Sequence, residues 1–193
     1  YLNKDSLKEI KIWFNFLAKK NKYENIILLG HSRGGLNVMQ FYSILNDFEK
    51  DLVKNVALLA PISDNFENTV DKLSDNSLIN KIKSNDLSSN EIIKIDFLSC
   101  ENARVEYSTF NDYYNIKKMG TGSSASLLGL LKRFTVKMLI VTASDDTITP
   151  LTHNRVDSLK QKNITLIQID GSDHFFRDLY FDDMFDELLE FIQ

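Results

Sequence analysis

The chain has 193 residues, of which 43% are hydrophobic and 26% charged, values typical of one folded domain and not of a disordered chain. Acidic and basic residues number 27 and 23 and alternate along the chain, which argues against a nucleic-acid groove or a polybasic membrane surface and favours a small or neutral partner. The single cysteine excludes an internal disulfide and favours a reducing, cytoplasmic location, and no stretch approaches the about 20 apolar residues of a membrane span.

The first 62 residues alternate between helical and strand patterns. Apolar residues at three-to-four spacing predict an amphipathic helix over Asp5–Lys20. Its expected buried stripe consists of Leu7, Ile10, Trp13, Phe14 and Leu17. Short apolar runs at Asn25–Gly30 and Val53–Ala60 predict strands that are buried on both faces of a parallel sheet. With a helix expected over Gly34–Leu45 between them, this part of the chain is predicted to be α/β.

Residues 63–126 break this alternation and are predicted to form a helical insertion between the two parts of the core, 1–62 and 127–193. One of its expected helical fragments is Ser88–Leu98, and Gly120–Ser126 is interpreted as a loop because it follows no strand. Most of its larger apolar side chains are expected to form the insertion's own core, with one or two lining a pocket. These side chains are Phe97, Leu98, Tyr107, Phe110, Tyr113 and Tyr114.

The alternation of strand and helix resumes after the insertion. Strands are predicted at Val136–Thr142 and Ile164–Ile169, and helices at Pro150–Lys160 and Leu179–Ile192. Both parts of the chain therefore predict one α/β fold, a parallel sheet flanked by helices.

A serine lies in a glycine-rich turn between the first predicted strand and the next helix. The stretch Gly30-His-Ser-Arg-Gly34 matches the pattern G-x-S-x-G, and three of the seven glycines fall at positions 30, 34 and 35. At such a tight turn, neighbours with Cβ atoms would collide with the strand or the helix. The turn is expected to hold the Ser32 hydroxyl above the carboxyl end of the sheet, at the positive end of the helix, where an oxyanion is stabilised.

A serine hydroxyl is a weak nucleophile and needs a histidine as base. The sequence has three histidines. His31 adjoins Ser32 and is expected to point away from it, and His153 lies at the start of a predicted helix. His174 lies in a loop after the last predicted strand, from which it can reach over the carboxyl ends of the strands, so it is the predicted base.

The acid that orients the base should also follow a strand. Asp145 and Asp146 both come soon after the strand that ends at Thr142. One of the two is expected to face the site, and the other to face solvent or to cap the next helix. The residues alone do not choose between them.

Together, the GHSRGG segment, the segment from Asp146 to Pro150 and the Gly171-x-x-His-Phe-Phe segment resemble the α/β-hydrolase superfamily, and most closely its small esterase and serine-aminopeptidase-like lipase branches. The resemblance implies that Ser32 is the nucleophile and His174, in a Gly-x-x-His loop, the base. It implies Asp146 as the acid, four residues before a proline that opens a helix, and places the backbone N–H of Arg33 in the oxyanion hole. It also implies a cap at 63–126, and no metal or cofactor.

The activity that follows from this resemblance is cleavage of a carboxylic ester through an acyl-enzyme. The same three residues would also serve a thioesterase, lipase or peptidase, and a hydrolase-like module that binds a ligand without catalysis is a further alternative. A Rossmann-type nucleotide site is disfavoured because the glycines lack the G-x-G-x-x-G spacing.

The family also predicts parts that precede this sequence. There, the second oxyanion donor comes from a loop after an earlier strand, and several strands precede the helix expected at Asp5–Lys20. The sequence begins at Tyr1 without a methionine or a signal-peptide pattern, so we expect it to be the C-terminal part of a longer hydrolase. A missing segment or a second chain would then pair beside Ile26–Leu29, which is otherwise a long apolar edge.

Overall fold

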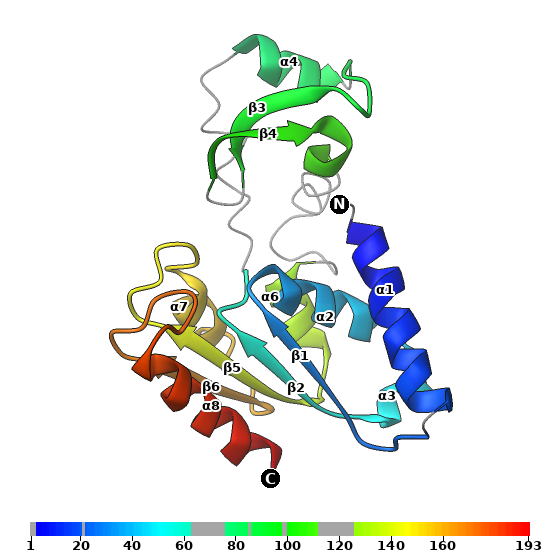
Figure 1. Ribbon diagram of the computed structural model, residues 1–193, viewed down its shortest axis with the longest axis vertical. Helices are drawn as coiled ribbons and strands as arrows, with labels where there is room; N and C mark the ends of the chain where they lie inside the picture. The colour runs from blue at the N-terminus through cyan, green and yellow to red at the C-terminus, as the bar shows by residue number, and fades with distance from the viewer. Residues whose placement is uncertain (1–2, 21, 63–75, 85, 98–99, 112–125) are drawn as a thin grey trace.

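The computed structural model describes residues 3–20, 22–62, 76–84, 86–97, 100–111 and 126–193. A four-stranded parallel sheet in the order β1-β2-β5-β6 forms the centre of the larger lobe (Figure 1). Its strands are β1 (Ile26–His31), β2 (Val53–Leu59), β5 (Lys137–Ala143) and β6 (Ile164–Ile169). The predicted α/β fold with a parallel sheet is therefore confirmed.

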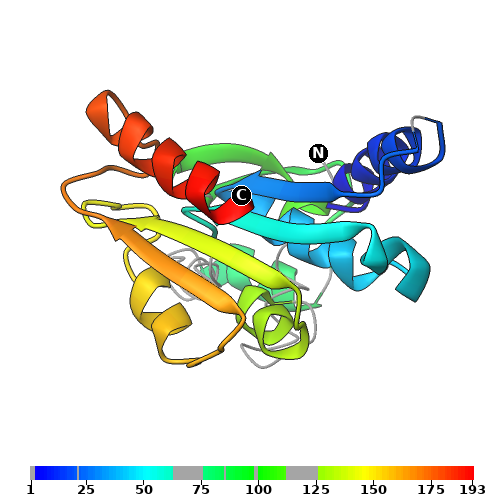
Figure 2. The ribbon, with the colours of Figure 1, turned by 90° about the horizontal axis from the view of Figure 1, so that it is seen from below.

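Helices cover both faces of this sheet. Figure 2 shows α2, α6 and α7 on one side and α8 on the other. The helices of this lobe are α1 (Asn3–Asn15), which continues as a π-helical turn over Phe16–Lys20, α2 (Arg33–Ser43), α3 (Asp47–Asp51), α6 (Leu127–Arg133), α7 (Thr152–Asp157) and α8 (Leu179–Ile192). None of the described helices combines the length and apolarity that a membrane span requires.

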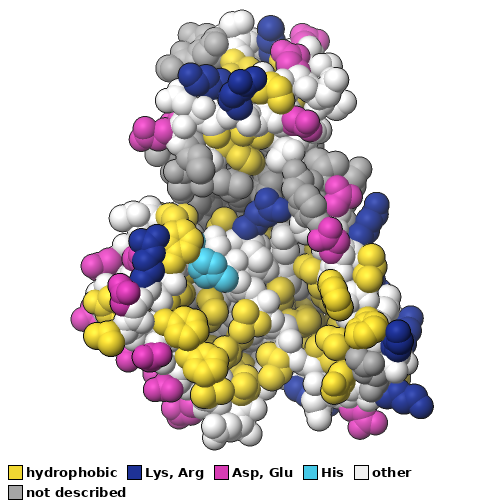
Figure 3. Space-filling model, in the orientation of Figure 1, with side chains coloured by type: hydrophobic (Ala, Val, Ile, Leu, Met, Phe, Trp, Pro, Cys, Tyr) yellow, Lys and Arg dark blue, Asp and Glu magenta, His cyan; other side chains and the backbone are white. Residues whose placement is uncertain are grey.

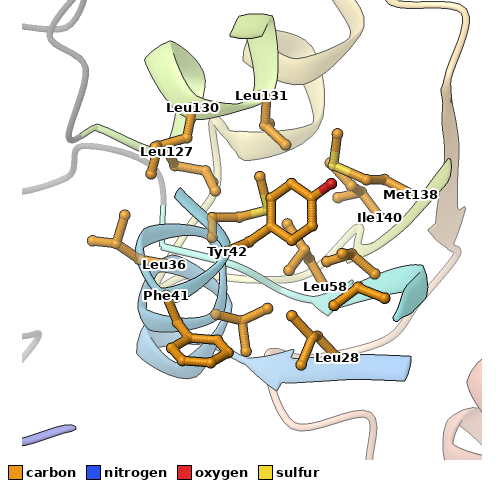
Figure 4. Packing of buried hydrophobic residues seen from close by; sticks show 14 of the residues in the cluster. Leu28, Leu36, Phe41, Tyr42, Leu58, Leu127, Leu130, Leu131, Met138 and Ile140 are labelled. Carbon is orange, nitrogen blue, oxygen red and sulfur yellow. The ribbon is translucent and has the colours of Figure 1, made fainter. Parts of the chain in front are cut away.

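Two apolar clusters hold the helices to the sheet. In the first, side chains of α2 and α6 pack on β1, β2 and β5, and Phe41, Leu58, Leu130 and Ile140 are fully buried there (Figure 4). In the second, side chains of α8 pack on the opposite face of the sheet, against β2, β5 and β6. Neighbouring residues of β2 and β5 thus enter different clusters, which explains why these strands read as continuous apolar runs.

The β1 edge of the sheet carries exposed apolar side chains. Ile27 and Leu29 are 41% and 48% exposed, and no strand in the described part of the chain lies on their outer side. The prediction that Trp13 is buried is wrong, because Phe14 turns toward Phe41 and leaves Trp13 66% exposed, lining a groove of about 430 Å³ between α1, α2 and β1. Figure 3 shows apolar side chains gathered across α1, β1 and α8.

The described part of the insertion differs from its predicted helical structure. It contains the helix α4 (Asn76–Ser84), a helical stretch at residues 107–111, and an antiparallel hairpin of β3 (Ile92–Phe97) and β4 (Cys100–Glu106). The prediction of a helix over Ser88–Leu98 is therefore wrong. Burial alternates along β3, where Ile93, Ile95 and Phe97 point inward, and this period of two belongs to a strand.

The insertion has an apolar cluster of its own. Ile62, which precedes the insertion, also belongs to it, and Tyr107 and Phe110 are buried in it, as expected for core side chains. Among the described residues, its buried members are Ile62, Ile82, Leu87, Ile93, Ile95, Phe97, Val105, Tyr107 and Phe110. Leu98, Tyr113, Tyr114 and residues 120–125 lie outside the described residues.

Two of the three clustered glycines are required by close packing. A Cβ atom on Gly30 would lie 2.4 Å from the carbonyl oxygen of Gly34, and one on Gly35 would lie 2.8 Å from the Cβ of Pro61. A Cβ on Gly34 would meet nothing within 4 Å. The expected crowding therefore applies to Gly30, which lets β1 approach α2, and to Gly35, which lets α2 approach Pro61, and not to Gly34.

We expect Gly30→Ala to lower the free energy of unfolding by about 1–3 kcal/mol, the usual cost of overpacking, because the added methyl group meets backbone that cannot rotate away. The matched control is Gly34→Ala in the first turn of α2, which is expected to be neutral or to stabilise by up to about 1 kcal/mol. Urea unfolding of the three proteins measures the difference, and equal midpoints for the two variants would contradict the close approach at Gly30.

Candidate active site

Ser32 occupies a strained turn between β1 and α2. Its backbone angles are φ 55° and ψ −121°, a combination that residues with a Cβ rarely adopt. The Ser32 N–H donates to the Leu59 carbonyl at 2.8 Å, and the Ser32 carbonyl accepts the N–H groups of Gly35 and Ile62, each at 3.1 Å. These hydrogen bonds hold the peptide in a conformation that costs about 1–3 kcal/mol.

The three residues predicted to form the site lie in one chain of hydrogen bonds. His174 Nε2 is 2.8 Å from Ser32 Oγ, and His174 Nδ1 is 2.7 Å from Asp146 Oδ2. Ser32 follows β1, Asp146 follows β5 and His174 follows β6, so the parallel sheet brings them together at the carboxyl ends of its strands. His174 and Asp146 are each only 4% exposed.

Asp146 is held as a carboxylate by several donors. Its Oδ1 accepts the backbone N–H groups of Ile148 at 2.7 Å and Thr149 at 2.8 Å, and its Oδ2 accepts the Thr149 hydroxyl at 2.5 Å as well as His174. Burial alone would raise the pKa of Asp146, but the hydrogen bonds from His174 and Thr149 outweigh burial and lower the pKa from 3.8 to about 2.

The charge on Asp146 fixes the tautomer of the base. A carboxylate only accepts hydrogen bonds, so the proton of neutral His174 lies on Nδ1, which donates to Asp146. Nε2 is then free to accept the hydroxyl proton of Ser32. The arrangement can remove a proton from Ser32 Oγ and return it to another atom near the same place.

The remaining candidates from the sequence lie outside this chain of hydrogen bonds. Asp145 is exposed, and its carboxylate accepts the neighbouring Ser144 hydroxyl at 3.1 Å. His153 contacts the Thr142 hydroxyl through Nδ1 at 2.9 Å. The geometry thus distinguishes Asp146 from Asp145, which the residues alone left open.

Two residues beside the site were not identified from the sequence. Thr149 supports Asp146, and an acidic residue followed three positions later by threonine is a local signal for such a turn. His31 contacts the backbone of His174 at 2.8 Å, a contact between residues 143 positions apart that no local pattern indicates.

The start of α2 lies beside Ser32. Arg33 is the first residue of this helix, so its backbone N–H is at the positive helix end, while its guanidinium lies 3.4 Å from the Ser6 hydroxyl of α1. Within the described residues, no group of three or more His, Cys, Asp or Glu side chains has the arrangement of a metal site.

No protein-family model and no curated protein sequence matches this chain. Solved structures do resemble it. Est1E from Butyrivibrio proteoclasticus is 18% identical with a TM-score of 0.67, and the match covers 100% of this chain and 72% of that one. A monoacylglycerol lipase of Paleococcus ferrophilus is 16% identical with a TM-score of 0.57, covering 98% and 74% of the two chains.

A third structure carries the name of the fold. It is an alpha/beta hydrolase enzyme from a sediment metagenome of the Mar Chica lagoon in Morocco, 14% identical with a TM-score of 0.54, and the match covers 95% of this chain and 69% of that one. At these identities the likeness concerns the fold. With its parallel sheet, its strand-turn-helix at Ser32 and these structural likenesses, the chain has the α/β-hydrolase fold.

Proposed function

We propose that the protein is a serine hydrolase that cleaves a carboxylic ester, with Ser32 as nucleophile, His174 as base and Asp146 as the acid that orients it. The observation that carries this proposal is the continuous chain of hydrogen bonds from Ser32 Oγ through the His174 ring to Asp146. The strained backbone of Ser32 supports an enzyme over a binding module, because strain of this kind is concentrated at catalytic positions.

The reaction follows from the direction of these hydrogen bonds. Ser32 Oγ attacks the ester carbonyl carbon while its proton moves to His174 Nε2. The carbonyl oxygen becomes an oxyanion, which the backbone N–H of Arg33 at the start of α2 stabilises. The carbon–oxygen bond to the alcohol then breaks, and His174 gives its proton to the departing alkoxide. The acyl group remains bound to Ser32 Oγ.

Water completes the cycle by the same steps. His174 takes a proton from the water as its oxygen attacks the acyl carbon, and then returns it to Ser32 Oγ as the carboxylic acid leaves. Asp146 remains ionised throughout, since its low pKa keeps it charged beside the imidazolium. An ester is the proposed substrate because one similar structure is named as a monoacylglycerol lipase and another as the esterase domain of a Rhodothermus marinus protein.

A fluorophosphonate probe tests the nucleophile directly. We expect the wild-type protein to be labelled at Ser32 at neutral pH, and Ser32→Ala and His174→Ala to lose labelling and to lose kcat for p-nitrophenyl esters by about 10⁶-fold. His153→Gln is the matched control, because its histidine contacts Thr142 outside the site, and it should be labelled like the wild type. A wild-type protein that binds ester analogues but is never labelled would favour the binding module.

The neighbouring aspartates allow a paired test of the acid. We expect Asp146→Asn to lower kcat by about 10,000-fold, because an amide in this place favours the wrong tautomer of His174. Asp145→Asn removes the same charge from an exposed position and is expected to leave kcat unchanged. Equal losses in the two variants, measured with p-nitrophenyl acetate, would show that net charge and not orientation of the base is at work.

The lowered pKa of Asp146 also predicts a pH dependence of stability. The ionised form is favoured by folding, so its contribution is complete above about pH 4, the usual pKa, and is lost as the pH falls through about 2. Over that interval the advantage of the wild type over Asp146→Asn in unfolding free energy should shrink by about 2 kcal/mol. Urea unfolding of both proteins from pH 6 downward measures it, and a constant difference would contradict the pKa shift.

A further inference from the structure

His31 forms a long-range contact with the loop that carries the proposed base. It is the last residue of β1 and directly precedes Ser32. Its Nε2 lies 2.8 Å from the backbone carbonyl oxygen of His174. The same strand therefore leads directly into the proposed nucleophile and, through His31, contacts the backbone of the proposed base.

The ring of His31 is packed as well as hydrogen-bonded. Its centroid lies 5.0 Å from the His174 ring, 5.9 Å from that of Phe175 and 6.5 Å from that of Phe176. Phe176 is 2% exposed, so one side of the loop is fixed in the protein interior. This packing limits the directions in which the His31 ring can turn.

The chemistry of the contact defines the proton on His31. A carbonyl oxygen only accepts hydrogen bonds, so His31 Nε2 must carry a hydrogen and donate it. Neutral His31 then has its proton on Nε2, and doubly protonated His31 has one there too. The hydrogen bond can form whether His31 is neutral or doubly protonated. Because Nε2 already carries a hydrogen and donates it to His174, this contact supports the loop and does not make His31 a second base.

Other contacts hold the loop at its beginning. The Gly171 N–H donates to the Ser144 hydroxyl at 2.7 Å, and the Ser172 carbonyl accepts the Asp145 N–H at 2.9 Å. These two bonds tie the loop to the segment after β5, the segment that also carries Asp146. The bond from His31 ties His174 itself to β1, and so to the strand that determines the position of Ser32.

We propose that His31 is a positioning residue that fixes the separation of His174 Nε2 and Ser32 Oγ by holding the backbone of His174 against β1. This role rests on the proposed function, since it concerns how the base meets the nucleophile. His31 touches neither the ester nor the reacting atoms in the proposed mechanism. Its contribution is to keep His174 Nε2 at hydrogen-bonding distance from Ser32 Oγ, which is 2.8 Å in the structure.

Substitutions that keep or remove the donor test the role kinetically. A displacement of about 1 Å between reacting groups can cost about 100-fold in rate, so we expect His31→Phe to lower kcat about 10- to 100-fold with KM little changed. His31→Gln keeps an N–H near the position of Nε2 and should recover most of the lost kcat. A wild-type kcat in His31→Phe, or equal losses in both variants with their folds intact, would overturn the proposal.

Nuclear magnetic resonance of the imidazole nitrogens gives a readout that does not depend on activity. We expect neutral His31 of the wild type to carry its proton on Nε2, and the His174 ring signals to shift in His31→Phe but to stay near their wild-type positions in His31→Gln. A proton on Nδ1 of neutral His31 would overturn the proposal.

The two measurements separate failure of the inference from failure of the proposed function. If the wild type neither hydrolyses esters nor reacts with a fluorophosphonate, the proposed function fails, and the tautomer of His31 and the His174 signals still decide whether the support exists. If His31→Phe does not fold, His31→Asn serves in its place, because its shorter amide cannot reach the carbonyl while the side chain remains polar.

Discussion

The contact between Gly30 and the first turn of α2 leaves no space for a Cβ atom, and the geometry of the site follows from it. Because the strand passes so close to the helix, the chain must reverse within one or two residues, and Ser32 takes a left-handed conformation there. The backbone of Ser32 is hydrogen-bonded to Gly35 of α2 and to Leu59 and Ile62 at and just after the end of β2. These hydrogen bonds keep the backbone of Ser32 from relaxing to unstrained angles.

The parallel sheet supplies the second requirement, which is convergence. Asp146 and His174 lie far from Ser32 in the sequence, but strands of one direction place their following loops at one edge. Each loop is then adjusted by short-range contacts, in particular the turn in which Thr149 and Ile148 donate to Asp146. Side chains of three loops can therefore meet with hydrogen-bond precision although loops are the most variable parts of a fold.

The sequence predicted the strands and the turn at Ser32 because both depend on local order. Val56–Leu59 in β2 and Met138–Ala143 in β5 are continuously buried, and a Cβ atom at position 30 would collide with backbone only four or five residues further along the chain. The choice of Asp146 over Asp145 required a resemblance, since two adjacent carboxylates share one local context. His31 could not be assigned this way, because its partner is 143 positions away and is a backbone carbonyl.

The errors also have physical causes. In α1, a stripe of apolar residues is wider than the surface that α2 offers, so Phe14 is buried and Trp13 faces the groove at the β1 edge. In the insertion, Lys94 separates Ile93 from Ile95, and the alternation of period two in β3 is short enough to be read as a fragment of a helix. Tertiary pairing with β4 decides its structure.

Ile62 belongs to two parts of the molecule at once. Its side chain packs in the apolar cluster of the insertion, while its N–H donates to the carbonyl of Ser32. A movement of that cluster that carries Ile62 with it must stretch the hydrogen bond and alter the support of the strained peptide. The insertion and the turn at Ser32 are therefore coupled through Ile62. A ligand or partner that displaces the apolar cluster of the insertion would also change the backbone conformation of Ser32.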